Sequence, residues 1–451
     1  HSDALIRRQA RSANSGWESS AALLGAVQDG PEADRILKEL ATHANLDSTD
    51  AGGFQDAIVN MLSRDGVGLI CSPMYAFGWC QGLIAARDIL ARIPDEERRQ
   101  RAAAAGPVVA SRYAAMASYA LNIRCAGAFL PNVGDTSRAN AHDTDWFQKD
   151  AWSMLLETWR RNRNPYYAAL ALKLSSPAEI LFDHAGVVRQ IEEDAKPVAD
   201  DLQQPSRILG GYGAAILETG LGRPDPRDKA AAFLFYGPAW GHGHADSLNL
   251  EVFARGYRVM PDKGRHHGGT HYHNVVEVDG QDQRPWVEGS RFGWLNHFAS
   301  AHGVNYVDLG ARNHNYTALD RYRRCTALVD AGEGNAYVFD VFQVAGGRQH
   351  VFALHGPPHS AFTVSPELGP AGDDSSAYFK SGKFKNPMQA AAPVQGQVNA
   401  DWKFLFAADR TKPQETDVHL AATVWGAEGC TLMSADVTGD TPFDIRSIHL
   451  M

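Results

Sequence analysis

Long apolar runs are missing from this 451-residue sequence, so nothing in it predicts a membrane-spanning helix. Cysteine is scarce. The five cysteines are an odd number and none has Cys-x-x-Cys spacing, which argues against a cysteine-ligated zinc site and a disulfide framework. Positive charge is also in deficit, with 43 Lys and Arg against 52 Asp and Glu. This balance argues against a general nucleic-acid surface, because phosphate binding needs clustered basic residues.

An initiator methionine and a signal peptide are absent as well, since the sequence starts at His1 and reads at once as a helix. We expect that the N-terminus has been cut from a longer precursor.

The composition changes near residue 230. Before it, apolar residues recur three or four positions apart, which is typical of helices; after it, β-branched and aromatic residues alternate, which is typical of strands. Because helices and strands are segregated, we expect an α+β multidomain protein with a helical domain over 1–229 and an antiparallel β-sheet domain over 230–451. Residues 366–400 are rich in Gly, Ala, Ser and Pro and predict a long surface loop.

The expected helices cover 20–27, 33–44, 54–62, 78–93, 102–122, 146–174 and 185–202. The expected strands cover 232–236, 247–253, 257–260, 274–278, 324–329, 336–344, 350–354, 404–407, 419–424 and 430–434.

Three residues that could ligate a metal, His244, Asp262 and His273, occur in one β-rich stretch. Residues two apart share a face of an extended chain, so His242, His244 and Asp246 are expected on one side, at the mouth of a strand. A meander of three strands could bring His244, Asp262 and His273 to one point. Two imidazoles and a carboxylate suit a metal such as Zn²⁺ and leave one coordination position open. The same residues could instead form a hydrogen-bonded group that fastens a sheet edge.

A cupin site has a similar outline, with Gly-x-His-x-His followed by a glutamate. Here the glutamate, Glu251, comes too far after His244 and falls on the opposite face of the strand. The cupin interpretation therefore fails on geometry.

A Gly-rich loop over residues 65–75 leads into an apolar helix. Ser72 is a plausible N-cap and Pro73 fits the first helical position, which places Tyr75 in the first turn. The positive end of the helix dipole favours phenolate, a form suited to acid–base chemistry. A tyrosine of the core or its rim would give the same pattern.

Taken in order, these motifs resemble the heparinase II/III-like polysaccharide lyases, which include alginate and oligoalginate lyases and heparinase II. The resemblance covers roughly residues 10–360, and 65–75 is similar to the loop that carries the family's catalytic tyrosine. The other matching segments are 235–237, 240–248, 256–262, 273–281, 337–342 and 350–356.

The resemblance implies an N-terminally truncated, incomplete (α/α) toroid followed by an antiparallel β-sandwich, with substrate in the groove between them. It implies β-elimination on a uronic acid within an anionic polysaccharide or oligosaccharide. Tyr75 would be the acid and possible base, and His242 the histidine that meets the substrate. His244, Asp262 and His273 would bind a divalent metal, Zn in a structural role.

Departures from the family leave the group that neutralises the uronate carboxylate open. The family has a histidine-bearing pair where this chain has Trp17-Glu18-Ser19, so Asn14 or a protonated Glu18 would replace it. The expected substrate-binding residues are Trp240, Tyr272, Arg138, Arg284 and Arg324, with the arginines supplying the local basic groove that an acidic protein needs for an acidic polymer. The resemblance also implies a periplasmic or secreted protein.

Two alternatives remain. A glycoside hydrolase on the same scaffold would need two carboxylates, for which Glu18 with Asp135 or Asp145 are the candidates. A glycan-binding protein could have kept the scaffold and lost the proton-transfer groups.

Overall fold

The protein is described by a computed structural model that forms two compact units. One unit comprises His1–Ile123, Asp145–Leu202 and Leu209–Tyr212, and the other comprises Arg124–Thr144, Gln203–Ile208 and Gly213–Met451. The structure describes residues 30–41, 58, 62–68, 70–102, 107–136, 152–174, 187–198, 201–238, 241–283, 291–313, 319–358, 360–380, 384–409, 412–437 and 445–451.

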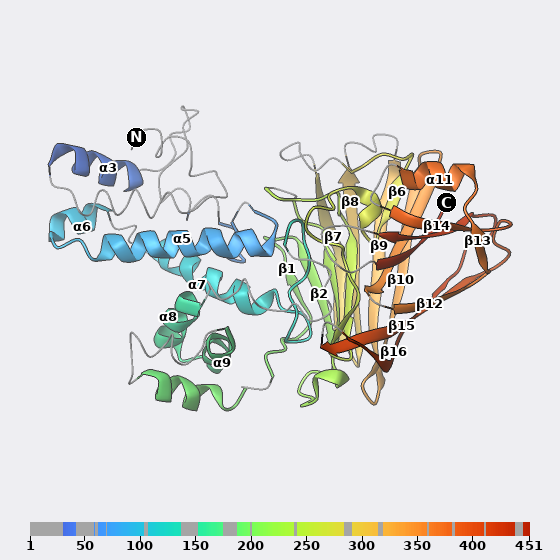
Figure 1. Cartoon of the computed structure of the whole chain (residues 1–451). Helices are drawn as coiled ribbons and strands as arrows, with labels where there is room; N and C mark the ends of the chain where they lie inside the picture. The colour runs from blue at the N-terminus through green and yellow to red at the C-terminus, as the bar shows by residue number, and fades with distance from the viewer. Residues whose placement is uncertain are drawn as a thin grey trace. The chain divides into compact units, whose positions relative to one another are not determined.

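The first unit is helical (Figure 1). Its helices are α3 (Pro31–Ala41), α5 (Pro73–Ala91), α6 (Glu96–Ala102), α7 (Pro107–Asn122), α8 (Trp152–Asn162) and α9 (Pro165–Leu174), with a further helix over 187–195. α3, α5, α7 and α9 all begin with proline, which presets the helical φ and lacks only an N–H that the first turn leaves unused. None of the helices in the described ranges is long and apolar enough to cross a membrane.

The single helix predicted over 146–174 is wrong, because two helices occupy the described part of this range. α8 ends before Arg163, whose φ of 56° lies in the left-handed region, and Pro165 starts α9. Neither residue can continue α8. A residue with left-handed φ interrupts a right-handed helix, and proline has no backbone N–H to donate to the preceding turn.

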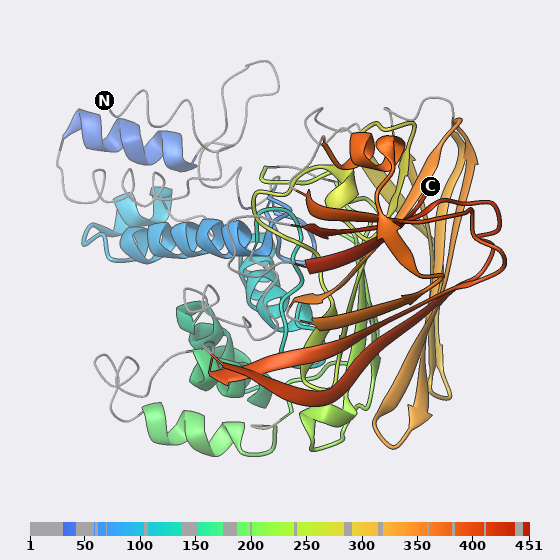
Figure 2. The same cartoon turned by 45° about the vertical axis from the view of Figure 1, so that its right-hand side comes forward.

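The second unit is built from antiparallel sheets, whose long strands run side by side in Figures 1 and 2. A five-stranded sheet has the order β1-β2-β3-β4-β5 and a four-stranded sheet the order β10-β9-β8-β7. Their strands are β1 (Arg207–Leu209), β2 (Ala214–Thr219), β3 (Ala230–Phe235), β4 (Asn249–Ala254), β5 (Tyr257–Met260), β7 (Arg291–Ala301), β8 (Val304–Asn313), β9 (Leu319–Gly332) and β10 (Asn335–Gly346).

Two further sheets contain the C-terminal strands, in the orders β13-β14-β17-β18-β11-β6 and β12-β15-β16. These strands are β6 (Val276–Val278), β11 (His350–Pro358), β12 (Ser360–Ser365), β13 (Leu368–Pro370), β14 (Phe384–Ala390), β15 (Val398–Asp409), β16 (Lys412–Val424), β17 (Leu432–Val437) and β18 (Ile445–Leu450). Helices and antiparallel sheets together give the expected α+β class.

The main core lies between the five-stranded and four-stranded sheets. Leu217, Leu234 and Leu250 from the first sheet share one apolar cluster with Val307 and Leu328 from the second. β2 and β3 are buried along their whole length, so their sheet is covered on both faces. Burial of this kind supplies most of the driving force for folding, at about 25 cal/mol per Å² of apolar surface.

A segment from far upstream, residues 124–136, covers part of the other face of the five-stranded sheet; we call it the docking segment. Phe129 stacks on Phe253 of β4 with ring centroids 5.2 Å apart. The backbone N–H of Asn132 donates to Glu251 of β4 at 2.6 Å, and Arg258 of β5 pairs with the same carboxylate at 2.5 Å. Buried carboxylates are costly without such partners, so these contacts fix the docking segment on the sheet.

Two sequence predictions about the β region need correction. Residues 366–400 are not one surface loop, since they contain β13, the helix α11 (Asp373–Lys380) and β14. Strands also begin before residue 230, because β1 and β2 precede it, and the docking segment belongs to the second unit.

Candidate functional site

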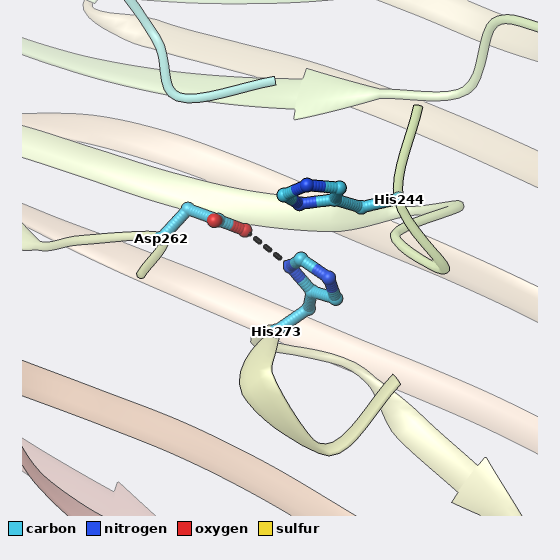
Figure 3. Close-up of side chains that lie close together, drawn as sticks. All are labelled: His244, Asp262 and His273. Atoms are coloured by element: carbon cyan, nitrogen blue, oxygen red, sulfur yellow. Dashed lines mark hydrogen bonds and ion pairs between the residues drawn. The ribbon is translucent and has the colours of Figure 1, made fainter. Parts of the chain in front are cut away.

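His244, Asp262 and His273 come together beside the five-stranded sheet (Figure 3). His244 precedes β4, Asp262 follows β5, and His273 follows a short 3-10 turn, Thr270–Tyr272. One potential ligand atom from each lies within 4.8 Å of the other two, and all three residues are buried. His273 donates from Nδ1 to Asp262 Oδ2 at 2.5 Å, and the rings of His244 and His273 lie 5.5 Å apart. We call these three residues the His-Asp-His cluster.

Side-chain amides hold the cluster in place. Asn249 donates from Nδ2 to Asp262 Oδ2 at 2.8 Å and accepts from the backbone N–H of Asn274 at 2.9 Å. The backbone N–H of Gly264 donates to the other oxygen of Asp262 at 2.6 Å, and Asn132 of the docking segment donates to its carbonyl oxygen at 3.1 Å. These contacts join three loops at the end of the sheet.

Burial makes a negative charge on Asp262 costly. It raises the pKa of this carboxyl to about 7, against the stabilising effect of nearby His244. Burial also lowers the pKa of His244, but the bond to Asp135 and the charges of Asp246 and Asp262 outweigh it, and the net shift is upward. The cluster therefore favours a compensating positive charge, which a proton or a cation can supply. Two imidazoles and one carboxylate are also a donor set that divalent zinc accepts.

Asp135 of the docking segment joins His244 to His242. His242 donates from Nδ1 to Asp135 Oδ2 at 3.1 Å, and His244 donates from Nε2 to Asp135 Oδ1 at 3.0 Å. The backbone N–H of His266 donates to the same Oδ1 at 3.0 Å. Partial burial would raise the pKa of Asp135, but these three hydrogen bonds hold it far below its usual range. Asp135 is therefore an ionised acceptor shared by two imidazoles.

The two histidines differ in exposure. The side chain of His242 is 33% exposed and that of His244 only 4%. His242 can meet a solute, whereas His244 is buried within the His-Asp-His cluster.

The predicted extended geometry of His242, His244 and Asp246 is wrong. β4 begins only at Asn249, and the preceding loop contains His242 with φ of 61° and Leu248 with φ of 65°. The imidazoles are brought together by Asp135 rather than by a shared strand face. The sequence indicates Asp135 only as a possible hydrolase carboxylate, and the Gly134-Asp135 pair in a loop is its one local signal.

Tyr75 lies in the first turn of α5, as predicted, with Ser72 as N-cap and Pro73 as the first helical residue. Its side chain is half-buried. The preceding loop is braced inside the helical unit, where Asp65 accepts from the backbone N–H of Tyr212 at 2.9 Å and the Tyr212 hydroxyl donates to Cys71 O at 2.5 Å. A fixed loop gives Tyr75 a defined position.

Tyr272 and Arg324, which we predicted to bind substrate, are instead buried structural residues. Arg324 is fully buried, pairs with Asp340 at 2.9 Å and donates to the carbonyl oxygen of Leu248 at 2.8 Å. Tyr272 stacks on Phe384 with centroids 5.5 Å apart. The guanidinium of Arg324 is therefore committed to protein partners, and the ring of Tyr272 packs within the protein. The other predicted residues lie outside the described ranges: Asn14, Glu18, Arg138, Asp145, Trp240 and Arg284.

A second group of potential metal ligands consists of His271, Glu277 and Asp282. Asp282 is exposed, and its Oδ1 already accepts from the backbone N–H of Thr270 at 2.7 Å. The group is more open than the His-Asp-His cluster, which makes it the weaker candidate for a tightly held ion.

The chain matches no protein-family model and no curated protein sequence. Among solved structures it is similar to one described as the crystal structure of heparinase III, with a TM-score of 0.54 and 12% sequence identity. The match covers 100% of this chain and 62% of that one, so this chain spans less than two thirds of the other's length. A likeness at this identity shows a shared, heparinase-like fold of helices and antiparallel sheets.

Proposed function

We propose that this chain is a polysaccharide lyase that cleaves a uronic-acid-containing anionic glycan by β-elimination. In this proposal the helices form an incomplete (α/α) toroid and the sheets a β-sandwich of the heparinase II/III type. The observation that carries it is the pairing of a partly exposed His242 with the buried His-Asp-His cluster through Asp135, on a fold shared with heparinase III.

The proposed reaction needs three services from the protein. A group beside the uronate carboxylate, Asn14 or a protonated Glu18, neutralises its charge and makes the C5 proton more acidic. Tyr75, as phenolate, removes this proton, and a double bond forms between C4 and C5 while the C4–O bond breaks. Tyr75 then gives the proton to the departing O4, so no water is consumed. His242 meets the sugar and assists, and Trp240, Arg138 and Arg284 contact the anionic chain.

We also propose that His244, Asp262 and His273 hold one structural divalent cation, Zn²⁺. The donor set and the raised pKa of Asp262 support this proposal, together with the bond from His244 to Asp135. Histidine ligands commonly donate their second ring nitrogen to a carboxylate in this way. The ion would supply the positive charge that the buried carboxylate requires. The protein is further proposed to act in the periplasm or outside the cell, which cell fractionation tests.

In the glycoside hydrolase alternative, Asp135 could serve only as the ionised carboxylate and not as the acid. An inverting or retaining hydrolase needs a carboxylic acid that keeps its proton, which requires a raised pKa. The pKa of Asp135 is instead lowered by its histidine partners. The other two candidates, Glu18 and Asp145, lie outside the described residues.

The test is incubation with alginate, heparan sulfate, hyaluronan and glucuronan, followed by ultraviolet absorbance of unsaturated uronate and by assay of reducing ends. A lyase raises both signals on at least one polymer. A rise in reducing ends alone would indicate a hydrolase, and binding with neither signal would indicate a glycan-binding protein; either result overturns the proposal.

A further inference from the structure

One carboxylate, Asp135, meets both histidines but on opposite ring nitrogens. It accepts from Nδ1 of His242 through Oδ2 and from Nε2 of His244 through Oδ1. A carboxylate has no proton to give, so each ring must present an N–H to it. In the neutral rings, the proton then sits on Nδ1 of His242 and on Nε2 of His244.

The two rings therefore present different unprotonated nitrogens, which suit different tasks. In His242 the lone pair is on Nε2, in a side chain that is 33% exposed. In His244 the lone pair is on Nδ1, and Figure 3 shows this ring turned toward Asp262 and His273. We propose that Asp135 is a positioning residue that sets opposite tautomers in these two histidines, one for substrate and one for a metal ion. The substrate half of this inference rests on the proposed lyase function.

The docking segment is built to hold Asp135 in this place. The backbone N–H of Asp135 donates to the carbonyl oxygen of His242 at 3.0 Å. Asn132, three residues earlier, makes two hydrogen bonds. Its backbone N–H donates to the Glu251 carboxylate at 2.6 Å, and its Nδ2 donates to the carbonyl oxygen of Asp262 at 3.1 Å. The segment that carries this carboxylate is thus held by Asn132 at the five-stranded sheet and by the backbone of Asp135 at the loop of His242.

The backbone N–H of His266 donates to Oδ1 of Asp135 at 3.0 Å. Any side chain that replaces Asp135 must therefore keep a hydrogen-bond acceptor at the Oδ1 position. In Asp135→Asn the amide oxygen is therefore held at the Oδ1 position, where it still accepts from His244. The amide NH₂ must take the Oδ2 position and donate to Nδ1 of His242. This donation moves the His242 proton to Nε2, while His244 keeps its tautomer.

Asp135→Asn should therefore separate the two tasks. We expect kcat to fall on the order of 100-fold or more with KM little changed, because the nitrogen that meets the substrate becomes protonated while the fold is kept. Zn²⁺ bound per chain should stay at the wild-type value. Asp135→Ala should impair both tasks, with a lower kcat and a metal affinity that falls about 10- to 100-fold. Asp225→Asn is the matched control, because it removes a surface carboxylate that pairs with Arg227 and should change neither property.

The direct readout is nitrogen NMR of histidine-labelled protein loaded with Zn²⁺, at about pH 8, where a histidine of ordinary pKa is neutral. The His242 signal is assigned by its loss in His242→Gln. We expect the proton on Nδ1 in the wild type and on Nε2 in Asp135→Asn. The same tautomer in both proteins, a wild-type kcat in Asp135→Asn, or loss of metal from Asp135→Asn overturns the inference. If the wild type cleaves no glycan, the proposed function fails, and the NMR and metal measurements still decide the role of Asp135.

Discussion

A β-carbon on Gly134 would lie 2.1 Å from the carbonyl oxygen of His242. Gly134 also has φ of 57°, in the region where only glycine is unstrained. These two facts make Gly134 the point at which the docking segment meets the loop of the candidate active site. The close approach is what allows the next residue, Asp135, to reach both imidazoles.

Gly134→Ala should therefore destabilise the protein and disturb the site together. We expect the free energy of unfolding to fall by about 2 to 5 kcal/mol, from backbone strain plus the steric clash. Denaturant unfolding measures this change. Gly222→Ala is the matched control, because Gly222 has φ of 77° but nothing within 4 Å of its added carbon, so only the strain of about 1 to 2 kcal/mol applies. Equal losses in the two variants would show that the approach to His242 does not matter.

Tyr75→Phe should remove glycan cleavage without unfolding the protein. The phenyl ring keeps the shape of the first turn of α5, but the proton carrier is lost, so we expect a fall in kcat of about 100- to 10,000-fold. Initial rates on the cleaved polymer measure it. Tyr337→Phe, at an exposed position of β10, is the control and should keep the wild-type rate. Full activity in Tyr75→Phe would remove Tyr75 from the mechanism.

His244→Ala and His273→Ala should each lose the bound divalent metal, because each removes one of three ligands. Elemental analysis of purified protein measures the metal, and chelation of the wild type should lower its melting temperature. His271→Ala should keep the metal, which separates the His-Asp-His cluster from the second group of potential ligands. His419→Ala on β16 serves as a control away from both groups. A wild type that folds normally and contains no metal would contradict the proposal.

Buried Glu218 should make stability depend on pH. Burial raises its pKa to about 7, although Arg207 opposes the shift. Because its folded pKa lies above the unfolded value, its contribution is complete below about pH 4.5 and is lost as pH rises through about 7. We expect the unfolding free energy of the wild type to fall by about 3 kcal/mol relative to that of Glu218→Gln as pH rises over this interval. A difference that stays constant with pH would show that Glu218 does not titrate in the fold.

Periodicity predicted much of the fold because it reports local burial. The strand predicted over 257–260 is confirmed as β5, and helices do precede most of the strands. β7 and β8 went unrecognised, since their sequences mix glycine, asparagine and charged residues among the apolar ones. Tertiary pairing, rather than local preference, makes such segments strands.

The site was only partly predictable for a related reason. The spacing of His244, Asp262 and His273 along successive strands predicted that they would meet, and they do. No sequence pattern predicted the contact of Asp135 with His242, because the docking segment lies more than a hundred residues before His242 in the sequence. Arg324 looked like a ligand for an anion, but its charge is used within the core by Asp340.

The mass of the cleaved glycan tests the central claim most directly. β-Elimination breaks the glycosidic bond without adding water, whereas hydrolysis adds one water per bond. The fragment that begins at the cleaved bond should therefore be lighter by one water than its hydrolytic counterpart, should absorb as an unsaturated uronate, and should not form with Tyr75→Phe. Fragments that all carry the added water, or no fragments from any uronate polymer, would contradict the account.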